Sequence, residues 1–505
     1  MNAIRFAGAM TLLASASVVA CADTPAAAPL APTAVTLVPY TVPEILKRVP
    51  PLAHDNSGRF PMISIAAFRM AADDNSWEGG KPLPPEAIRE LVKRGFTQWI
   101  PPRESYIPYA LALQAEGAAV IMMEGQAFNG PAGDIPDGLH QLPPDFKRDP
   151  DQPAQQPHYP CPLLLEGWRR KAEELRATFR KYKEAGVNVR AVWFDWEVEP
   201  FGGESEWKEA RACTRCRAMF PPGILDDHDK YRAFIARWRN QLFSTYFVAP
   251  ILEQYPQCSV TNWEEVISTA EHRTPNWTDS RLLPPTGIGM YTAANPVVYG
   301  DTNAYDLHWK EHPGWPLDEA HMDRVYTEVM FAQISGYEAN ALREAPEKQS
   351  VPWVDRYCAD NPDPKIPILS RPRYREILRH AWLRGADAMQ VFNPDWFKDA
   401  RHNIELEELE DAQAIYDEML GYRKFLDGGT PINLDAPSAT YDGPIWSGRR
   451  LGDEALVRGF TQGTHAVTAT ITPFEGGPAV EIACPPEGAT YLIRRDGGKV
   501  AVVKQ

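Results

Sequence analysis

Short apolar runs alternate with amphipathic segments along most of this chain. Eight of the runs have the length and composition of buried strands, and helical periodicity fills most of the intervals between them. We expect the strands at 62–68, 96–100, 118–123, 189–197, 258–263, 287–291, 351–355 and 388–392. We expect helices at 85–94, 106–115, 164–185, 231–255, 322–340, 373–384 and 406–426. This alternation predicts a parallel α/β fold, and a closed (β/α)8 TIM barrel explains the eight strands without further assumptions.

The pattern changes after the last helix, where Gly428, Gly429 and Pro431 interrupt it. Short runs rich in Thr and Val follow at 455–460, 465–471, 479–483 and 490–494, separated by turns. They predict a small C-terminal antiparallel β domain over 428–505, after a barrel over 58–427. This region carries no set of catalytic residue types, so we favour a role in covering a barrel edge over a role in binding sugar.

Residues 1–20 have the pattern of a signal peptide, because Arg5 is followed by an uncharged apolar run that is too short to span a bilayer. The run ends in Val-Val-Ala before Cys21, which resembles a lipoprotein cleavage box with Cys21 as the lipidated residue. Ordinary cleavage after Ala22 is the alternative. Both predict export to the periplasm or cell surface, with membrane contact only through a lipid on Cys21. The stretch 21–57 begins as an Ala- and Pro-rich tether and leads into the barrel.

Composition and motifs narrow the function classes. Of 505 residues, 44% are hydrophobic and 24% are charged, which is the balance of a globular protein. The 52 Lys and Arg against 67 Asp and Glu give a net charge of −15, which disfavours binding to nucleic acid. The sequence has no phosphate-binding Gly-x-x-x-x-Gly-Lys-Ser/Thr loop, no Gly-x-Gly-x-x-Gly fingerprint, no Gly-x-Ser-x-Gly elbow and no His-Glu-x-x-His. We therefore expect no cofactor and no catalytic metal.

The fourth expected strand carries three carboxylates. Between 191 and 199, apolar residues alternate with a set that includes Asp195, Glu197 and Glu199. One set of a barrel strand faces the helices and the other faces the axis, so we expect the acids inside, at the carboxyl end where barrel active sites form. Neighbouring carboxylates raise one another's pKa, and cleavage of a glycosidic bond needs a protonated acid beside an ionised one. The structural alternative is an ion-pair cluster neutralised by Arg69 or Arg103.

Two local resemblances point to the same class of enzyme. The segment Ala191-Val-Trp-Phe-Asp-Trp-Glu197 resembles the Asp-x-Glu strand end of barrel glycosidases such as the hyaluronidases. In that family the Glu is the acid/base and the Asp supports a nucleophilic N-acetyl group of the substrate, which implies that Glu197 donates the proton and Asp195 orients. Downstream, Cys213-Thr-Arg-Cys216-Arg-Ala-Met-Phe220 is similar to the cysteine loop of family 42 β-galactosidases and related bacterial barrel proteins. In those relatives such cysteines can hold a structural zinc.

The cysteines by themselves leave three states open. Besides Cys21 there are six, Cys161, Cys213, Cys216, Cys258, Cys358 and Cys484. Export permits disulfides, which we prefer to free thiols and to zinc. A tetrahedral zinc site needs four ligands, and Cys161 with His158 could complete one around the Cys-x-x-Cys if two loops meet. Because the disulfide is the preferred state, we expect no metal.

A second carboxylate must lie about 5–5.5 Å from the acid in a retaining glycosidase and about 6.5–9.5 Å away in an inverting one. Candidates at other strand ends are Glu124, Glu264, Glu265, Asp355 and Asp395. Many barrel glycosidases with the acid on strand four carry the nucleophile on strand seven, which by analogy favours Asp355 as the catalytic partner.

Aromatic residues recur near the same strand ends. Indole rings stack on the apolar faces of sugars, although packing between helix and strand is the alternative for each ring. We expect the substrate-binding set to be Glu199, Glu124, Tyr291, Trp193, Trp263, Trp353 and Asp395.

These patterns together predict an exported glycoside hydrolase acting on a poly- or oligosaccharide. A non-catalytic glycan-binding surface lipoprotein on a barrel scaffold is the alternative. A polysaccharide lyase that uses Tyr291 or a His as base is a third and weaker hypothesis. Neither the sugar nor the linkage follows from the sequence.

Overall fold

The computed structural model describes residues 38–64, 68–72, 81–128, 137–147, 160–198, 202–262, 293–294, 296–300, 304–305, 309, 312–344, 349–357, 365–392, 403–497 and 499–505. Within strands β4 and β5 and helix α10, the side chains of 125–128, 195–198 and 336–344 are not described. Every structural statement below refers to the described residues.

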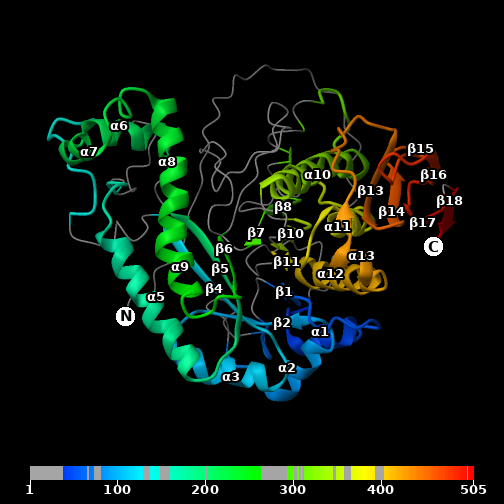
Figure 1. Ribbon diagram of the computed structural model, residues 1–505, viewed down its shortest axis with the longest axis horizontal. Coiled ribbons are helices and arrows are strands. Elements are labelled where there is room, and N and C mark those ends of the chain that lie inside the picture. The colour runs from blue at the N-terminus through cyan, green and yellow to red at the C-terminus, as the bar shows by residue number, and fades with distance from the viewer. Residues whose placement is uncertain are drawn as a thin grey trace.

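Parallel strands form the wall of a (β/α)8 barrel, as the alternating pattern predicts (Figure 1). One group pairs in the order β3 (Trp99–Ile100), β4 (Val120–Phe128), β5 (Val189–Val198), β6 (Ser259–Asn262). The other pairs in the order β2 (Phe96–Thr97), β1 (Met62–Ser64), β11 (Gln390–Val391), β10 (Trp353–Asp355), β8 (Val297–Tyr299). The groups join because β2 and β3 follow one another on either side of Gln98. Between β6 and β8 in the chain, β7 (Ala293–Ala294) pairs with β9 (Gln349–Ser350).

The strand beside β10 in the wall is not the sixth strand expected from the sequence. Residues 287–291 lie outside the described residues, and the strand that pairs with β10 is β8, further along the chain. Its run of three apolar residues is too short to stand out against the longer runs elsewhere. The other seven expected strands each overlap a strand of the wall.

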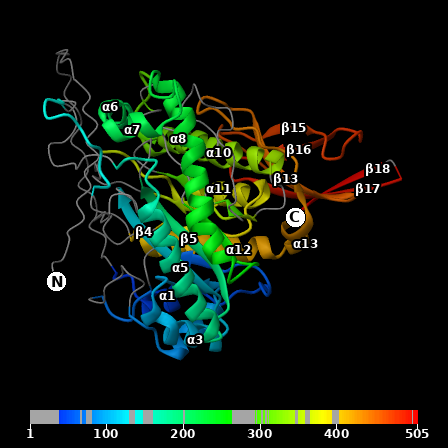
Figure 2. The same ribbon diagram turned by 60° about the vertical axis from the view of Figure 1, so that its left-hand side comes forward.

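Most of the helices lie on the outer side of this wall, and α6 and α7 lie at one end of the molecule (Figures 1 and 2). They are α1 (Val42–Arg48), α2 (Pro85–Val92), η1 (Glu104–Tyr106), α3 (Ile107–Ala115), α5 (Glu166–Glu184), α6 (Glu204–Ala212), α7 (Thr214–Met219), α8 (His228–Phe243), a π-helical turn (Ser244–Val248), α9 (Ala249–Leu252), α10 (Glu319–Glu344), α11 (Arg371–Arg384), α12 (Ile404–Leu420) and α13 (Arg423–Gly428). Helix α5 buries Trp168, Leu175, Phe179 and Tyr182, one stripe at helical spacing. No helix in the described part of the chain is both long and apolar enough to cross a membrane.

Alternation along the strands divides the core into two parts. On β5, Val192 and Phe194 pack against the helices, whereas Ala191 and Trp193 lie in a separate cluster inside the barrel. This interior cluster also contains Phe60, Ile63, Trp99, Ile121, Met123, Val297, Tyr299, Val351, Trp353 and Ala388. Each strand thus sends alternate side chains to opposite faces, which is how a small barrel fills its centre.

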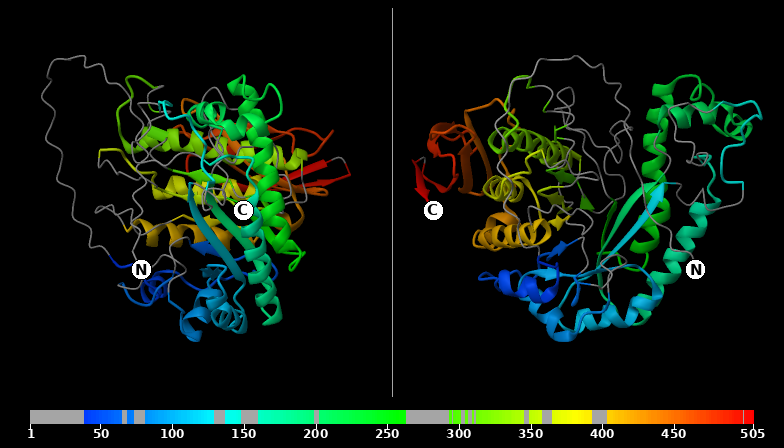
Figure 3. Two further views of the ribbon diagram at one scale, coloured as in Figure 1. Left: turned by 90° about the vertical axis from the view of Figure 1, so that its left-hand side faces the viewer. Right: turned by 180° about the vertical axis from the view of Figure 1, so that it is seen from behind.

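The C-terminal strands form an antiparallel sheet and a hairpin at one end of the molecule (Figures 1 and 3). The sheet order is β12 (Thr430–Pro431), β13 (Pro444–Leu451), β14 (Glu454–Thr461), β17 (Ala489–Asp496), β18 (Lys499–Lys504), and β15 (Val467–Ile471) pairs with β16 (Val480–Cys484). Buried arginines join the sheet to α11: Arg449 donates to the carbonyl oxygens of Trp382 and Ala386 at 2.9 and 3.2 Å. The sequence predicted β14 and β17 of this sheet and both strands of the hairpin, but missed β12, β13 and β18.

Candidate active site

Aromatic side chains from β5, β8 and β10 pack together in the interior of the barrel. Trp193 and Trp353 are fully buried, and the Trp193 ring lies 6.1 Å from that of Phe60. The ring of Phe392 stacks on Tyr299 at 4.9 Å and lies 5.7 Å from Trp353. The two expected sugar-stacking tryptophans therefore have no exposed ring face among the described residues. They fill the barrel centre, which is the packing alternative weighed above.

The indole N–H groups of these two tryptophans are also buried, and they have no hydrogen-bond partner within the described ranges. A buried donor without an acceptor costs free energy, so native proteins usually supply one from protein, water or ligand. The centre of the barrel is therefore packed with apolar side chains and holds two buried donors for which the described residues supply no acceptor.

Asp355 lies at the carboxyl end of β10, the seventh strand of the barrel wall. It is fully buried, and its register partner is Tyr299 of the interior cluster. Its Oδ1 accepts the backbone N–H of Gly300 at 2.8 Å. A β-carbon at Gly300 would lie 2.8 Å from the carbonyl oxygen of Arg356, so only glycine permits β8 and β10 to approach this closely.

Helix α12 binds the residues that follow β10 through two glutamates. The backbone N–H groups of Arg356 and Tyr357 donate to Oε1 of Glu408 at 2.9 and 3.3 Å, and the Arg356 guanidinium pairs with Glu407 at 2.6 Å. Burial raises the pKa of Glu408 well above its ordinary value, against the opposing effect of its hydrogen bond with Arg356. Glu408 was not among the expected site residues, because an acid within the helical run Glu405-Leu-Glu-Glu-Leu-Glu resembles an exposed one.

Asp195 and Glu197 are placed only by their backbone. Both belong to β5, where Asp195 is the register partner of Gly125 and Glu197 that of Ala127 on β4. Their side chains are outside the description, as are the whole residues Cys21, Glu199, Trp263, Tyr291 and Asp395. Their roles therefore stay predictions.

Glu124 lies on the opposite face of β4 from the interior. Its neighbours Ile121 and Met123 point inward, whereas Met122 packs with the helices. In agreement with this alternation, Glu124 forms an ion pair with Lys171 of α5, which covers the outer side of β4. This placement does not favour the substrate contact expected from the sequence, and Glu124 has no part in the proposal below.

Four metal-ligating side chains meet beyond the ends of β4 and β5. His140, Cys161, Cys213 and Cys216 are all buried, and one ligand atom from each lies within 4.8 Å of the others. The sulfurs of Cys161 and Cys213 are 3.6 Å apart, far beyond the length of a disulfide bond, and none of the described cysteines forms a disulfide. This is contrary to the preference for a disulfide. The four side chains form a candidate metal site, in which the imidazole would come from His140. His158, considered from the sequence, lies outside the described residues. We call these four residues the His–Cys cluster.

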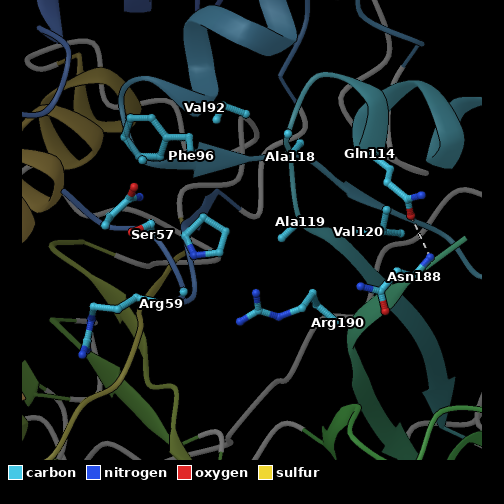
Figure 4. A pocket seen from close by; sticks show the side chains of 15 residues that line it. Ser57, Arg59, Val92, Phe96, Gln114, Ala118, Ala119, Val120, Asn188 and Arg190 are labelled. Atoms are coloured by element: carbon cyan, nitrogen blue, oxygen red, sulfur yellow. Dashed lines mark hydrogen bonds between the residues drawn. The ribbon is translucent and has the colours of Figure 1, made fainter. Parts of the chain in front are cut away.

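A pocket opens at the other end of the barrel (Figure 4). Its lining comes from segments that precede or begin strands, including Gly95, Ala118 and Asn188, together with Arg59 and Arg190. It therefore lies at the amino ends of the strands, where residues of this fold serve stability, and the carboxyl ends carry the chemistry.

No family model and no curated protein matches the chain. Solved structures with a similar fold include a β-galactosidase from the haloarchaeon Halorubrum lacusprofundi (13% identity, TM-score 0.43), matched over 68% of this chain and 57% of its own. Others are an Anoxybacillus α-amylase (11%, 0.41; 81% and 78%) and a GH30 endoxylanase from Clostridium papyrosolvens (11%, 0.35; 90% and 96%). These neighbours are glycoside hydrolases, and the chain spans a little over half of the β-galactosidase. At these scores they carry no argument about activity, and neither the hyaluronidases nor the family 42 resemblance gains support.

Proposed function

We propose that this protein is an exported glycoside hydrolase that cleaves O-glycosidic bonds of a poly- or oligosaccharide. In this proposal Glu197 is the general acid/base, Asp195 orients it, and Asp355 is the second carboxylate. Glu197 protonates the departing glycosidic oxygen, and Asp355 either attacks the anomeric carbon or activates a water molecule.

The alternation along β5 carries the proposal. Ala191 and Trp193 lie inside the barrel, and Val192 and Phe194 face the helices. Continued along the strand, the same alternation supports an axial position for residues 195 and 197, at the end of the barrel where active sites form.

The position of Asp355 gives separate support. Trp353 and Asp355 are two residues apart on β10, and Trp353 belongs to the interior cluster. Strands β5 and β10 are the fourth and seventh of the wall, so acids on both would face one another across the mouth.

The test is release of reducing ends from a broad panel of polysaccharides and oligosaccharides. We expect activity on at least one glycan and a loss of about 100-fold or more in Glu197→Gln, the size of a general-acid contribution. Glu204→Gln, an exposed acid at the start of α6, is the matched control and should keep full activity.

Equal activity in Glu197→Gln and wild type would move the acid elsewhere, with Glu199 next in line. If wild type cleaves nothing on the panel but binds glycans, the chain is a binding lipoprotein instead.

Export and lipidation at Cys21 form a separate part of the proposal. The intact mass of the protein from membranes should include a diacylglyceryl group, and Cys21→Ala should release the protein from the membrane fraction. A mature chain that begins after Ala22 without lipid would contradict the anchor and keep the export.

A further inference from the structure

The His–Cys cluster is built where two barrel loops meet. An isolated antiparallel bridge between Leu139 and Pro160 places His140 beside Cys161. The backbone N–H of Cys161 donates to the carbonyl oxygen of Gly138 at 2.9 Å, which fixes the same pairing. Both residues belong to the connection between β4 and α5.

The Cys-x-x-Cys turn approaches this bridge from the next connection, between β5 and α8. Arg215, which lies between the two cysteines, donates to the carbonyl oxygens of Asp137 and Leu139 at 2.6 and 3.0 Å. The backbone N–H of Thr214 donates to the carbonyl oxygen of Gln141 at 3.3 Å. Backbone contacts on both sides of His140 thus hold the two loops in register. Helices α6 and α7, which carry the turn, lie at the opposite end of the molecule from the C-terminal strands (Figure 1).

The spacing of the donor atoms matches a tetrahedron. Zn–S bonds of about 2.3 Å and Zn–N bonds of about 2.0–2.1 Å give edges of about 3.8 Å between sulfurs and about 3.5 Å between sulfur and nitrogen. The two sulfurs of Cys161 and Cys213 are 3.6 Å apart. Nδ1 of His140 lies 3.5 Å from Sγ of Cys161 and 3.3 Å from Sγ of Cys216.

Donor chemistry and burial select the ion and its role. Three thiolates and one imidazole form a set that prefers zinc to magnesium or calcium, which take oxygen ligands. The backbone N–H of Gln141 donates to Sγ of Cys213 at 3.2 Å, so one sulfur already accepts a hydrogen bond suited to a thiolate. All four side chains are buried, and four protein ligands leave no position open for substrate.

We propose that the His–Cys cluster binds one structural zinc ion, which ties the loop after β4 to the loop after β5. The zinc replaces protons on the three thiols, so binding releases protons and depends on pH. Because β5 is the strand that carries Asp195 and Glu197, the ion fixes the wall beside the proposed active site without taking part in its chemistry. The site does not depend on the proposed glycosidase activity.

Metal content of the full-length protein, purified without chelator, provides the test. We expect about one zinc per chain by elemental mass spectrometry, and X-ray absorption of that protein should show three sulfur ligands and one nitrogen ligand. Cobalt substituted for zinc should give thiolate-to-metal charge-transfer absorption.

Substitutions assign the ion to these residues. Cys216→Ala should weaken zinc binding by more than the factor of about 10 to 100 that loss of a supporting group costs. His140→Cys should keep the ion with four sulfur ligands, which separates ligation from a failure to fold. Cys258→Ala is the matched control, because Cys258 is a buried cysteine outside the cluster and should keep full zinc content.

Three results would overturn the proposal. The first is folded wild type that contains no zinc and takes up neither zinc nor cobalt. The second is undiminished zinc content in Cys216→Ala, and the third is a disulfide between Cys161 and Cys213 in the native protein, found by mass spectrometry of peptides without reduction.

Discussion

Two fully buried glutamates, one in α11 and one in α12, differ in their partners. Glu376 of α11 accepts a two-point contact from Arg458 of β14 at 2.7 and 2.6 Å and lies 3.3 Å from Nε2 of His380. Glu408 of α12 accepts two backbone N–H groups, and its other oxygen has no hydrogen-bond partner within the described part. Glu376 joins the barrel to the C-terminal sheet, and Glu408 supports the strand end that carries Asp355.

The pKa values of the two carboxyl groups move in opposite directions. Burial alone would raise the pKa of Glu376, but hydrogen bonds from His380 and Arg458 outweigh it and lower the pKa to about 2. Burial lowers the pKa of His380 to about 4, so this histidine is neutral and donates from Nε2. For Glu408, burial dominates and raises the pKa. A buried ion pair therefore holds α11 to the C-terminal sheet, whereas the carboxyl group behind the proposed active site has no ion-pair partner within the described residues and its pKa is raised by burial.

Breaking the matched pair should have the largest effect on stability. In Glu376→Gln the Arg458 guanidinium stays buried without a charged partner, which typically costs about 3–5 kcal/mol. We expect the free energy of unfolding in urea to fall by that amount. An unchanged unfolding midpoint would show that the pair contributes nothing to cohesion.

Closing the space at Gly300 should have the next largest effect. In Gly300→Ala the new methyl group meets the Arg356 carbonyl oxygen, and such overpacking typically costs about 1–3 kcal/mol. Because Oδ1 of Asp355 accepts the Gly300 N–H, we also expect lower turnover. Thermal unfolding and glycan cleavage are the measurements. Gly463→Ala is the matched control, because Gly463 likewise has no positive φ and its new methyl group would meet no atom closer than 3.4 Å.

The raised pKa of Glu408 should make the free energy of unfolding depend on pH. The folded-state pKa of Glu408 is raised, so its contribution is present below the unfolded pKa of about 4.3 and is lost as pH rises through the folded value. Glu376 has the opposite sign, because its stabilisation is present above the unfolded pKa and is lost as pH falls towards about 2.

Glu408→Gln should therefore stabilise the protein above the unfolded pKa. The gain should grow by up to about 1.4 kcal/mol per pH unit until the pH reaches the folded pKa of Glu408, so the free energy of unfolding should fall less steeply with rising pH than in wild type. Urea unfolding at a series of pH values would check this. If the free energy of unfolding of the variant changed with pH as steeply as that of wild type, the inference that burial raises the pKa of Glu408 would be contradicted.

The ion pair between Glu124 and Lys171 should matter least. Both side chains are partly exposed, so Lys171→Met should change the free energy of unfolding by no more than about 1 kcal/mol. Glycan cleavage should be unchanged if Glu124 faces the helices. A loss of activity larger than about tenfold would return Glu124 to the active site.

Hydrophobic periodicity predicted most of the barrel strands and the inward face of β5. Runs of apolar residues located seven strands of the barrel wall but not β8, and the alternation along β5 placed Trp193 inside. On β4, Met122 and Met123 are both apolar, so the sequence could not tell which face Glu124 takes. His140 lies in a connection without periodic pattern, and only the Leu139–Pro160 bridge brings it to Cys161. Glu408 becomes buried through packing of α12 against the end of β10, which no local signal records.

The most direct test of the central claim compares binding and turnover of one glycan by wild type and Glu197→Gln. Calorimetry measures the affinity, and reducing-end release measures the turnover. We predict that the variant keeps its affinity within about threefold and loses at least about 100-fold in turnover, because a general acid acts in the transition state rather than in the bound complex. Turnover equal to that of wild type would contradict the assignment of Glu197 as the acid.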